Sequence, residues 1–279
     1  MERGHNNRVP FPMYIYMILI IKHIDIEGPE TIGAHFQSKG YDLKVIDLFL
    51  GESLPSDFSN IEAVVVLGGP MNVYEEDKYP FLKPENVFIK KVLKREIPYL
   101  GICLGSQLLA KACGAKVTKS PGKEVGWFTI DLTEEGKKDP LFKGLGDKIN
   151  VFQWHEDTFA IPQGGWWLGK SARCAHQAFR VGSCAYGVQF HFEITDKSIK
   201  DWSDAYFKNN KAAEKNRKNA MLNVYKKKKR LFHETGTIIS DNFLKIVALR
   251  RSPVSKEAQL SFIRKKAVRR PHPDPAISR

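Results

Sequence analysis

The sequence predicts an α/β protein with a doubly wound, mixed sheet flanked by helices. Apolar runs of strand length alternate with segments of helical periodicity over residues 13–112. Two of these runs, 61–67 and 97–102, are almost wholly apolar, which is typical of parallel strands buried on both faces. After residue 116, shorter strand-like segments separated by turn residues replace this alternation. We therefore expect parallel strands first and antiparallel strands after them.

The first elements follow from the spacing of apolar residues. Residues 13–21 form a nearly unbroken apolar run that is too short to span a bilayer, and it lacks the small-residue cleavage site that would follow a signal peptide. A buried first strand is therefore favoured. We expect a helix over 31–39, a strand over 42–48 and a helix over 81–95, which leads into strand 97–102.

The later elements are expected to be antiparallel strands joined at the turn-rich segments 120–123 and 144–147. These strands are rich in β-branched and aromatic residues, and they lie near Val117 and over 127–132, 150–154, 166–171, 175–180 and 184–190. Thr195 can cap a helix that begins near Ser198. Helical periodicity returns over 237–249, which we expect to dock on the body of the protein.

Length and composition predict a single catalytic domain with appendages. Residues 1–12 are polar and aperiodic, so we expect a disordered leader. The domain is expected to span 13–249, with a core over 13–200 and C-terminal helices over 198–249. Four prolines and many arginines make 250–279 a basic tail that we expect to be disordered.

Positive charge is concentrated near the C-terminus. The formal net charge is +13, but ten Lys or Arg against one acid lie within 208–230 and nine against two lie within 250–279. The rest of the chain is slightly acidic, so only the C-terminal helical extension and tail are basic. Few aromatic residues interleave the basic run, which favours a solvated face over nucleic-acid binding and leaves the latter as an alternative.

Cys103 lies between strand 97–102 and the helix-forming segment 104–112. Gly101 and Gly105 flank it as G-x-C-x-G, the thiol counterpart of the G-x-S-x-G elbow that presents a nucleophile at a sharp turn. The helix N-terminus that follows favours a thiolate. A buried structural cysteine explains this segment equally well when it is considered alone.

His191 and Glu193 supply the partners that a cysteine nucleophile needs. They follow strand 184–190, and at spacing i, i+2 on extended backbone both side chains leave on the same side. Glu193 can then hold His191 in the tautomer that accepts a thiol proton. Gly69 and Cys103 both follow apolar strands, whose carboxyl ends meet in one crevice of a parallel sheet. The pattern therefore predicts a Cys-His-Glu site in that crevice.

The remaining cysteines predict no metal or disulfide chemistry. Cys113, Cys174 and Cys184 lack the elbow, so we expect inert thiols. There is no C-x-x-C pair, which disfavours a zinc site and fits the reducing cytoplasm. His176 has no evident partner and is expected to be structural.

Three motifs resemble those of the class I (triad) glutamine amidotransferases, as found in GMP synthetase, anthranilate synthase and carbamoyl phosphate synthetase. They are G-G-P at 68–70, G-I-C-L-G-S-Q at 101–107 and G-V-Q-F-H-F-E at 187–193. The resemblance covers about residues 13–200 and is greatest to stand-alone GMP-synthetase-like members, so we expect a flavodoxin-like sheet. Many relatives have a proline where this sequence has Phe192. This difference affects the geometry expected for the local turn, but the three triad residues themselves are present.

The resemblance implies hydrolysis of the glutamine side-chain amide. Cys103 would form a glutamyl thioester and release ammonia, and water would then release glutamate. His191 and Glu193 would complete the catalytic triad. The backbone N–H groups of Gly69 and Leu104 would form the oxyanion hole.

The resemblance also implies substrate contacts. Gln107 lies one helical turn beyond Cys103 and would contact the bound glutamine. Glu124, Gly126 and Trp127 match a segment whose backbone clasps the amino-acid end of the substrate in relatives. His155 also lies in a segment that resembles a recurrent family motif. For His155 we favour a role in the site wall or in a partner contact over a role as the base. The resemblance implies no cofactor.

Three functions remain open at this stage. The first is a glutaminase that supplies ammonia to a separate synthetase chain, because neither a P-loop nor an ATP-pyrophosphatase loop is present. The second is a γ-glutamyl peptide or amine hydrolase that uses the same thioester route. The third is a catalytically silent module that binds a partner or a nucleic acid. No membrane contact is expected.

Overall fold

The computed structural model describes residues 17–207 and 212–251. The predicted leader 1–12 and the predicted tail from residue 252 onward lie outside the described residues. The strands are β1 (Met17–Lys22), β2 (Asp42–Asp47), β3 (Ile61–Val66), β4 (Tyr99–Ile102), β5 (Val117–Leu132), β6 (Lys148–Phe159), β7 (Trp166–Lys170), β8 (Ala178–Val181) and β9 (Ala185–Val188). Within the described part of the chain they form one nine-stranded sheet in the order β2-β1-β3-β4-β9-β8-β7-β5-β6.

The sheet changes from parallel to antiparallel along its width. β2, β1, β3, β4 and β9 run parallel to one another, whereas β8, β7, β5 and β6 pair antiparallel. The predicted division into an earlier parallel part and a later antiparallel part is confirmed. β9 is the exception in chain order, because it returns to pair with β4 and so places the segment after it beside the end of β4.

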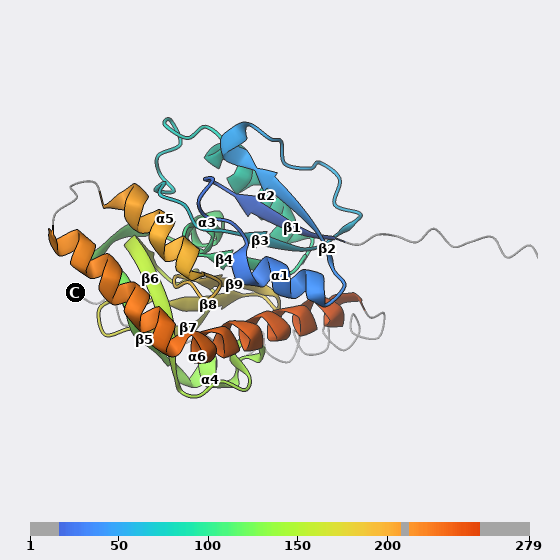
Figure 1. The fold of residues 1–279 in the computed structure, drawn as a ribbon. Helices are drawn as coiled ribbons and strands as arrows, with labels where there is room; N and C mark the ends of the chain where they lie inside the picture. The colour runs from blue at the N-terminus through green and yellow to red at the C-terminus, as the bar shows by residue number, and fades with distance from the viewer. Residues whose placement is uncertain (1–16, 208–211, 252–279) are drawn as a thin grey trace, which may run out of the picture.

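Helices cover both faces of the parallel part (Figure 1). They are α1 (Glu30–Ser38), α2 (Leu82–Lys94), α3 (Leu104–Ala112), α4 (Glu134–Lys138), α5 (Asp196–Tyr206) and α6 (Ala212–Arg251), with 3-10 turns η1 (Leu48–Leu50) and η2 (Pro140–Phe142). On β1, Ile18 and Ile20 pack with α1 and α6, whereas Leu19 and Ile21 pack with α2 and α3. Alternate side chains thus enter two separate cores, as the predicted doubly wound sheet requires.

Segment 120–123 is not the turn that its composition predicts. β5 continues through it, and the pairing with β6 only shifts register between Lys119 and Glu124. A local bulge accommodates the Ser-Pro-Gly-Lys sequence because the pairing resumes on both sides of it. The other predicted turn, 144–147, does separate β5 from β6, together with α4 and η2, which the sequence interpretation did not include.

A single helix, α6, replaces the separate basic and apolar segments expected after residue 207. It bends partway along its length (Figure 1). Its first part buries Met221 and Tyr225 against β5, β6 and α5, while its lysines lie largely at the surface. Its last part buries Phe243 and Val247 beside α1, so the predicted docking of 237–249 is confirmed. None of the helices in residues 17–207 and 212–251 has the length and apolarity to cross a lipid bilayer.

Candidate active site

Cys103 occupies a tight turn between β4 and α3. Its φ angle of 52° lies in the left-handed region that non-glycine residues rarely adopt, so the backbone is strained at this residue. Gly101 and Gly105 make the turn possible, because a Cβ on Gly101 would overlap the carbonyl oxygen of Gly105 and one on Gly105 would overlap that of Val66. The strand-to-helix elbow predicted around Cys103 is therefore present.

His191 and Glu193 lie just beyond β9 and meet Cys103 at the end of β4. The Nδ1 atom of His191 is 2.6 Å from Oε1 of Glu193, and both side chains are buried. His191 and Cys103 line the same cavity, and Cys103 is among the groups that raise the pKa of His191. The structure therefore brings the three predicted triad residues to one place, with Glu193 on the Nδ1 side of the His191 ring.

Phe192 contributes to this arrangement through its backbone. Its N–H donates a hydrogen bond to Oε2 of Glu193 at 2.8 Å, while Oε1 of the same carboxylate faces His191. Proline has no N–H and could not make this bond. The departure from the family's proline thus adds a hydrogen bond that fixes the carboxylate.

The pKa of His191 is raised well above its ordinary value of 6.5. Burial favours the neutral ring and opposes this rise, but the charge of Glu193 and the hydrogen bonds with Cys103 and Glu193 outweigh it. The ring therefore holds a proton more firmly than an exposed histidine does.

The predicted oxyanion donors, Leu104 and Gly69, lie next to each other in the structure. Leu104 is the first residue of α3, where backbone N–H groups have no partner within the helix. Gly69 follows β3, and it is tightly enclosed, because a Cβ there would lie 3.0 Å from Leu104 and 3.1 Å from His23. A Cβ on Gly68 would overlap the carboxylate of Glu27 and lie 3.2 Å from the ring of His191, so this loop packs directly against the triad.

A cavity of about 310 Å³ opens beside the thiol. Four residues predicted for the site line it: Cys103, His191, Gly69 and Gln107. The other lining residues come mainly from β5, β6, α5 and the loop after β3, and they are Glu27, Pro70, Met71, Asn72, Lys119, Lys123, Trp154, His155, Glu156, Asp157, Trp202 and Tyr206. The amide of Gln107 donates to the carbonyl of Asp157 at 3.3 Å.

Gln189 and Glu27 are among the site residues to which the sequence assigned no role. The amide of Gln189 lies 3.7 Å from the sulfur of Cys103. Gln189 precedes His191 by two residues, so the alternation of an extended strand could have indicated it. Glu27 lines the cavity and accepts a hydrogen bond from the hydroxyl of Tyr206 at 2.7 Å. Burial raises the pKa of Glu27, but nothing in its local sequence marks it as part of the site.

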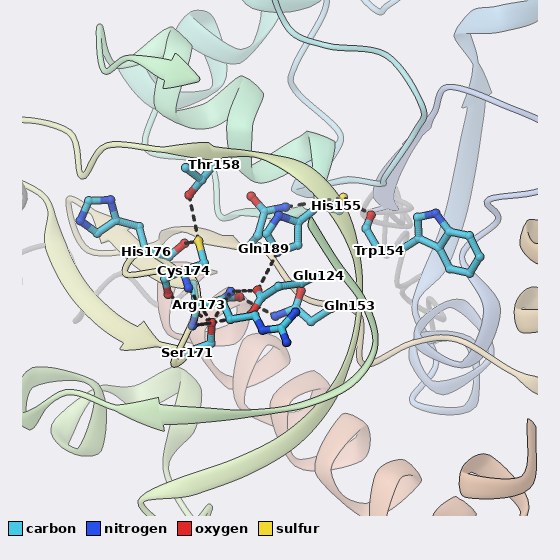
Figure 2. Close-up of polar contacts among 12 residues, drawn as sticks. Glu124, Gln153, Trp154, His155, Thr158, Ser171, Arg173, Cys174, His176 and Gln189 are labelled. Atoms are coloured by element: carbon cyan, nitrogen blue, oxygen red, sulfur yellow. Dashed lines mark hydrogen bonds and ion pairs between the residues drawn. The ribbon is translucent and has the colours of Figure 1, made fainter. Parts of the chain in front are cut away.

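Glu124 lies behind the cavity wall in a buried polar network (Figure 2). Its carboxylate accepts hydrogen bonds from Ser171 at 2.7 Å and from Gln177 at 2.6 Å, and it pairs with His155 at 2.9 Å. Burial alone would raise the pKa of Glu124, but these hydrogen bonds lower it. Because His155 also lines the cavity, the network supports that wall from behind.

Gly126 and Trp127 face α6. The indole of Trp127 donates to the carbonyl of Met221 at 3.0 Å and packs edge-on against Phe232. Gly126 has a φ angle of 110°, and a Cβ there would lie 3.7 Å from Met221. Among the described residues, the cavity lining includes neither of them, nor Glu124. Their predicted backbone contact with substrate stays a prediction.

The other three thiols differ from Cys103 in their surroundings. Burial raises the pKa of Cys113 to about 11 and also raises the pKa values of Cys174 and Cys184. These thiols are therefore protonated at neutral pH, which supports the expectation that they are inert.

Comparison with known proteins places the chain in a family. Residues 30–209 match the family model "Glutamine amidotransferase class-I". A putative glutamine amidotransferase-like protein, YfeJ of Salmonella typhimurium, is 34% identical over 179 residues, which are 62% of this chain and 75% of that protein. A GMP synthase (glutamine-hydrolyzing) of Thermosipho melanesiensis is 40% identical over 138 residues, which are 49% of this chain but only 25% of the synthase.

A solved structure agrees with these sequence matches. The crystal structure of a glutamine amidotransferase from Thermotoga maritima superposes with a TM-score of 0.74 at 35% identity, and the match covers 84% of this chain and 98% of that one. The elbow cysteine, the buried His-Glu pair and the mixed sheet thus occur in a chain that matches over most of its length. The protein belongs to the class I glutamine amidotransferases, a family whose chemistry is glutamine hydrolysis.

Proposed function

We propose that the protein hydrolyses the side-chain amide of glutamine through a thioester on Cys103. The observation that supports this proposal is that Cys103 and His191 line one cavity while the carboxylate of Glu193 lies 2.6 Å from Nδ1 of His191. The raised pKa of His191 suits a ring that accepts the proton of the Cys103 thiol. The thiolate then attacks the amide carbon of glutamine.

The remaining steps follow from the positions of the same groups. The backbone N–H groups of Gly69 and Leu104 stabilise the tetrahedral oxyanion. His191 returns its proton to the leaving nitrogen as the C–N bond breaks, so ammonia departs and the thioester remains. His191 then takes a proton from water, the resulting hydroxide attacks the thioester, and the C–S bond breaks to give glutamate. Glu193 keeps the ring oriented throughout.

We further propose that ammonia passes to an acceptor enzyme on another chain. The match to the GMP synthase of T. melanesiensis covers 25% of that synthase, so most of it lies outside the matched region. A separate synthetase would supply the corresponding activity here. Co-purification with a synthetase, together with glutamine-dependent amination by the pair, would support this assignment.

The cavity wall favours one alternative substrate class. Trp154, Trp202 and Tyr206 line the cavity beside the thiol, and apolar rings of this kind can hold a leaving group larger than ammonia. A γ-glutamyl peptide or amine would be cleaved by the same steps. Ammonia release from glutamine, measured beside glutamate release from γ-glutamyl compounds, separates the two substrates.

One labelling experiment tests the shared mechanism. A diazo-ketone analogue of glutamine should alkylate Cys103 and leave Cys113, Cys174 and Cys184 unmodified, as mapped by mass spectrometry. Free glutamine should slow the labelling, because both molecules occupy the same cavity. Labelling spread over all four thiols, or unaffected by glutamine, would contradict the proposed function and favour a silent binding module.

A further inference from the structure

We propose that His23 and Glu85 position the peptide group between Gly68 and Gly69, so that the N–H of Gly69 faces the oxyanion. This inference rests on the proposed function, because the role of Gly69 as an oxyanion donor is part of it. His23 and Glu85 are positioning residues, and among the described residues the cavity lining includes neither.

The imidazole of His23 links α2 to the loop after β3. His23 follows β1 and is fully buried, as is Glu85 on α2. The Nδ1 atom of His23 lies 2.9 Å from the carbonyl oxygen of Gly68. The Nε2 atom lies 3.0 Å and 3.1 Å from the two carboxylate oxygens of Glu85. The ring also stacks on Phe81, so its orientation is fixed from several sides.

Holding the carbonyl of Gly68 also sets the direction of the N–H of Gly69. Both groups belong to one planar trans peptide, in which C=O and N–H point in opposite directions. A peptide between two glycines rotates easily, because neither residue has a Cβ to restrict it. A hydrogen bond from His23 to the carbonyl removes that freedom and directs the N–H to the other side of the peptide.

The hydrogen-bonding groups around His23 also determine its protonation. A carbonyl oxygen can only accept a hydrogen bond, so Nδ1 of His23 must donate to Gly68. Burial acts to lower the pKa of His23, but Glu85, Gly68 and, more weakly, Glu27 raise it overall. The donating Nδ1 polarises the Gly68 carbonyl, and this polarisation strengthens the N–H of Gly69 as a donor.

Three variants test this role in the full-length chain. His23→Phe keeps an aromatic ring beside Phe81 but removes the donor to Gly68. We expect kcat for glutamine to fall about 100-fold to 1,000-fold, as for loss of one oxyanion donor, with KM changed less than threefold. Glu85→Gln keeps an oxygen that can accept from Nε2, so it should lose less than tenfold in kcat, whereas Glu85→Leu should lose more than Glu85→Gln.

His176→Phe is the matched control. It removes a buried hydrogen bond of the same kind, from Nδ1 of a histidine to the carbonyl of Phe159 at 2.7 Å, at a place outside the cavity lining of the described residues. It should keep wild-type kcat. Alkylation of Cys103 by iodoacetamide forms no oxyanion, so its rate should be the same in His23→Phe and in the wild-type protein and shows that the triad is intact.

The outcomes separate this inference from the proposed function. If Cys103→Ala still hydrolyses glutamine, the proposed function fails and this inference fails with it. If Cys103→Ala is inactive but His23→Phe keeps wild-type kcat, only the positioning role is overturned. Should His23→Phe not fold, nitrogen-15 NMR of the wild-type protein decides: a hydrogen on Nδ1 of His23 at neutral pH supports the role, and an unprotonated Nδ1 overturns it.

Discussion

Cys103 depends on its neighbours for its position more than on its own side chain. The backbone at this residue is strained, and overlap with neighbouring carbonyl oxygens excludes any side chain at Gly101 or Gly105. The strain is maintained because β4 is paired on both sides and α3 is buried. A substitution that removes the sulfur atom of Cys103 should therefore leave the fold unchanged.

Cys103→Ala should abolish glutamine hydrolysis and leave the melting temperature within a few degrees of wild type. Cys103 is buried but loses only one sulfur atom in this substitution, so the cavity created is small. Ammonia release and circular dichroism on the same sample check both parts. Turnover retained in the alanine variant would rule out the thioester route.

His191 and Glu193 should differ in their effect on kcat. His191→Asn removes the proton carrier and should approach the loss caused by Cys103→Ala. Glu193→Gln removes the charge but keeps an oxygen that can accept from Nδ1, so it should retain a measurable rate. Steady-state kinetics of both variants tests this order, and an equal loss in the two would show that Glu193 does more than orient the ring.

The elbow at Cys103 and the pairing of His191 with Glu193 could be predicted from the sequence because each residue lies in a recognisable local pattern. Cys103 lies in a glycine-flanked elbow, and His191 and Glu193 share a face of extended chain. Glu27, His23 and Glu85 could not be found in this way. Their contacts join β1 and the loop after it to α2 and α5, and a lone acid in a helix is normally interpreted as solvent-exposed.

At the level of elements, composition predicted β5 incorrectly at 120–123. Pro and Gly usually end a strand, but β6 pairs with β5 on both sides of this segment, and the two strands together outweigh the local preference. The cap at Thr195 was predictable because it is a local interaction: its hydroxyl accepts from the N–H of Ser198 at 3.3 Å, and α5 begins at Asp196.

α6 is expected to stabilise the fold through its last turns. Phe243 is fully buried and stacks on Phe36 of α1 at a centroid distance of 6.2 Å. Phe243→Ala should lower the free energy of unfolding by about 3–5 kcal/mol. Urea unfolding measures this difference. Leu249→Ala is the control on the same helix, because Leu249 is 58% exposed and should change stability little. Equal effects of the two substitutions would mean that the end of α6 does not pack as described.

For the whole molecule, the buried ionisable groups predict how stability depends on pH. The pKa values of His191 and His23 are raised above the ordinary value of 6.5, and that of Glu27 is raised above 4.5. The folded state then binds more protons than the unfolded state, so the free energy of unfolding falls as the pH rises through this range. Glu124 acts in the opposite direction below pH 4.5, because its pKa is lowered.

Stability should therefore be greatest between about pH 4.5 and 6.5 and should decline toward alkaline pH. Urea unfolding at pH 5.5, 7 and 9 measures this trend. His191→Asn should flatten the alkaline decline, because it removes one of the two histidines responsible. A free energy of unfolding that increases from pH 6.5 to 9 would contradict the direction assigned to both histidines.

The contact between α6 and the segment 191–193 means that the fold near His191 and Glu193 depends on residues late in the chain. A Cβ on Gly236 would lie 2.6 Å from the carbonyl oxygen of Phe192, the residue between His191 and Glu193. The two segments are closely packed, so a shift of α6 at this point must displace the backbone of His191 and Glu193. A protein shortened to end before residue 236 would leave that carbonyl exposed to water, and α6 is thus a structural support for the segment that carries His191 and Glu193.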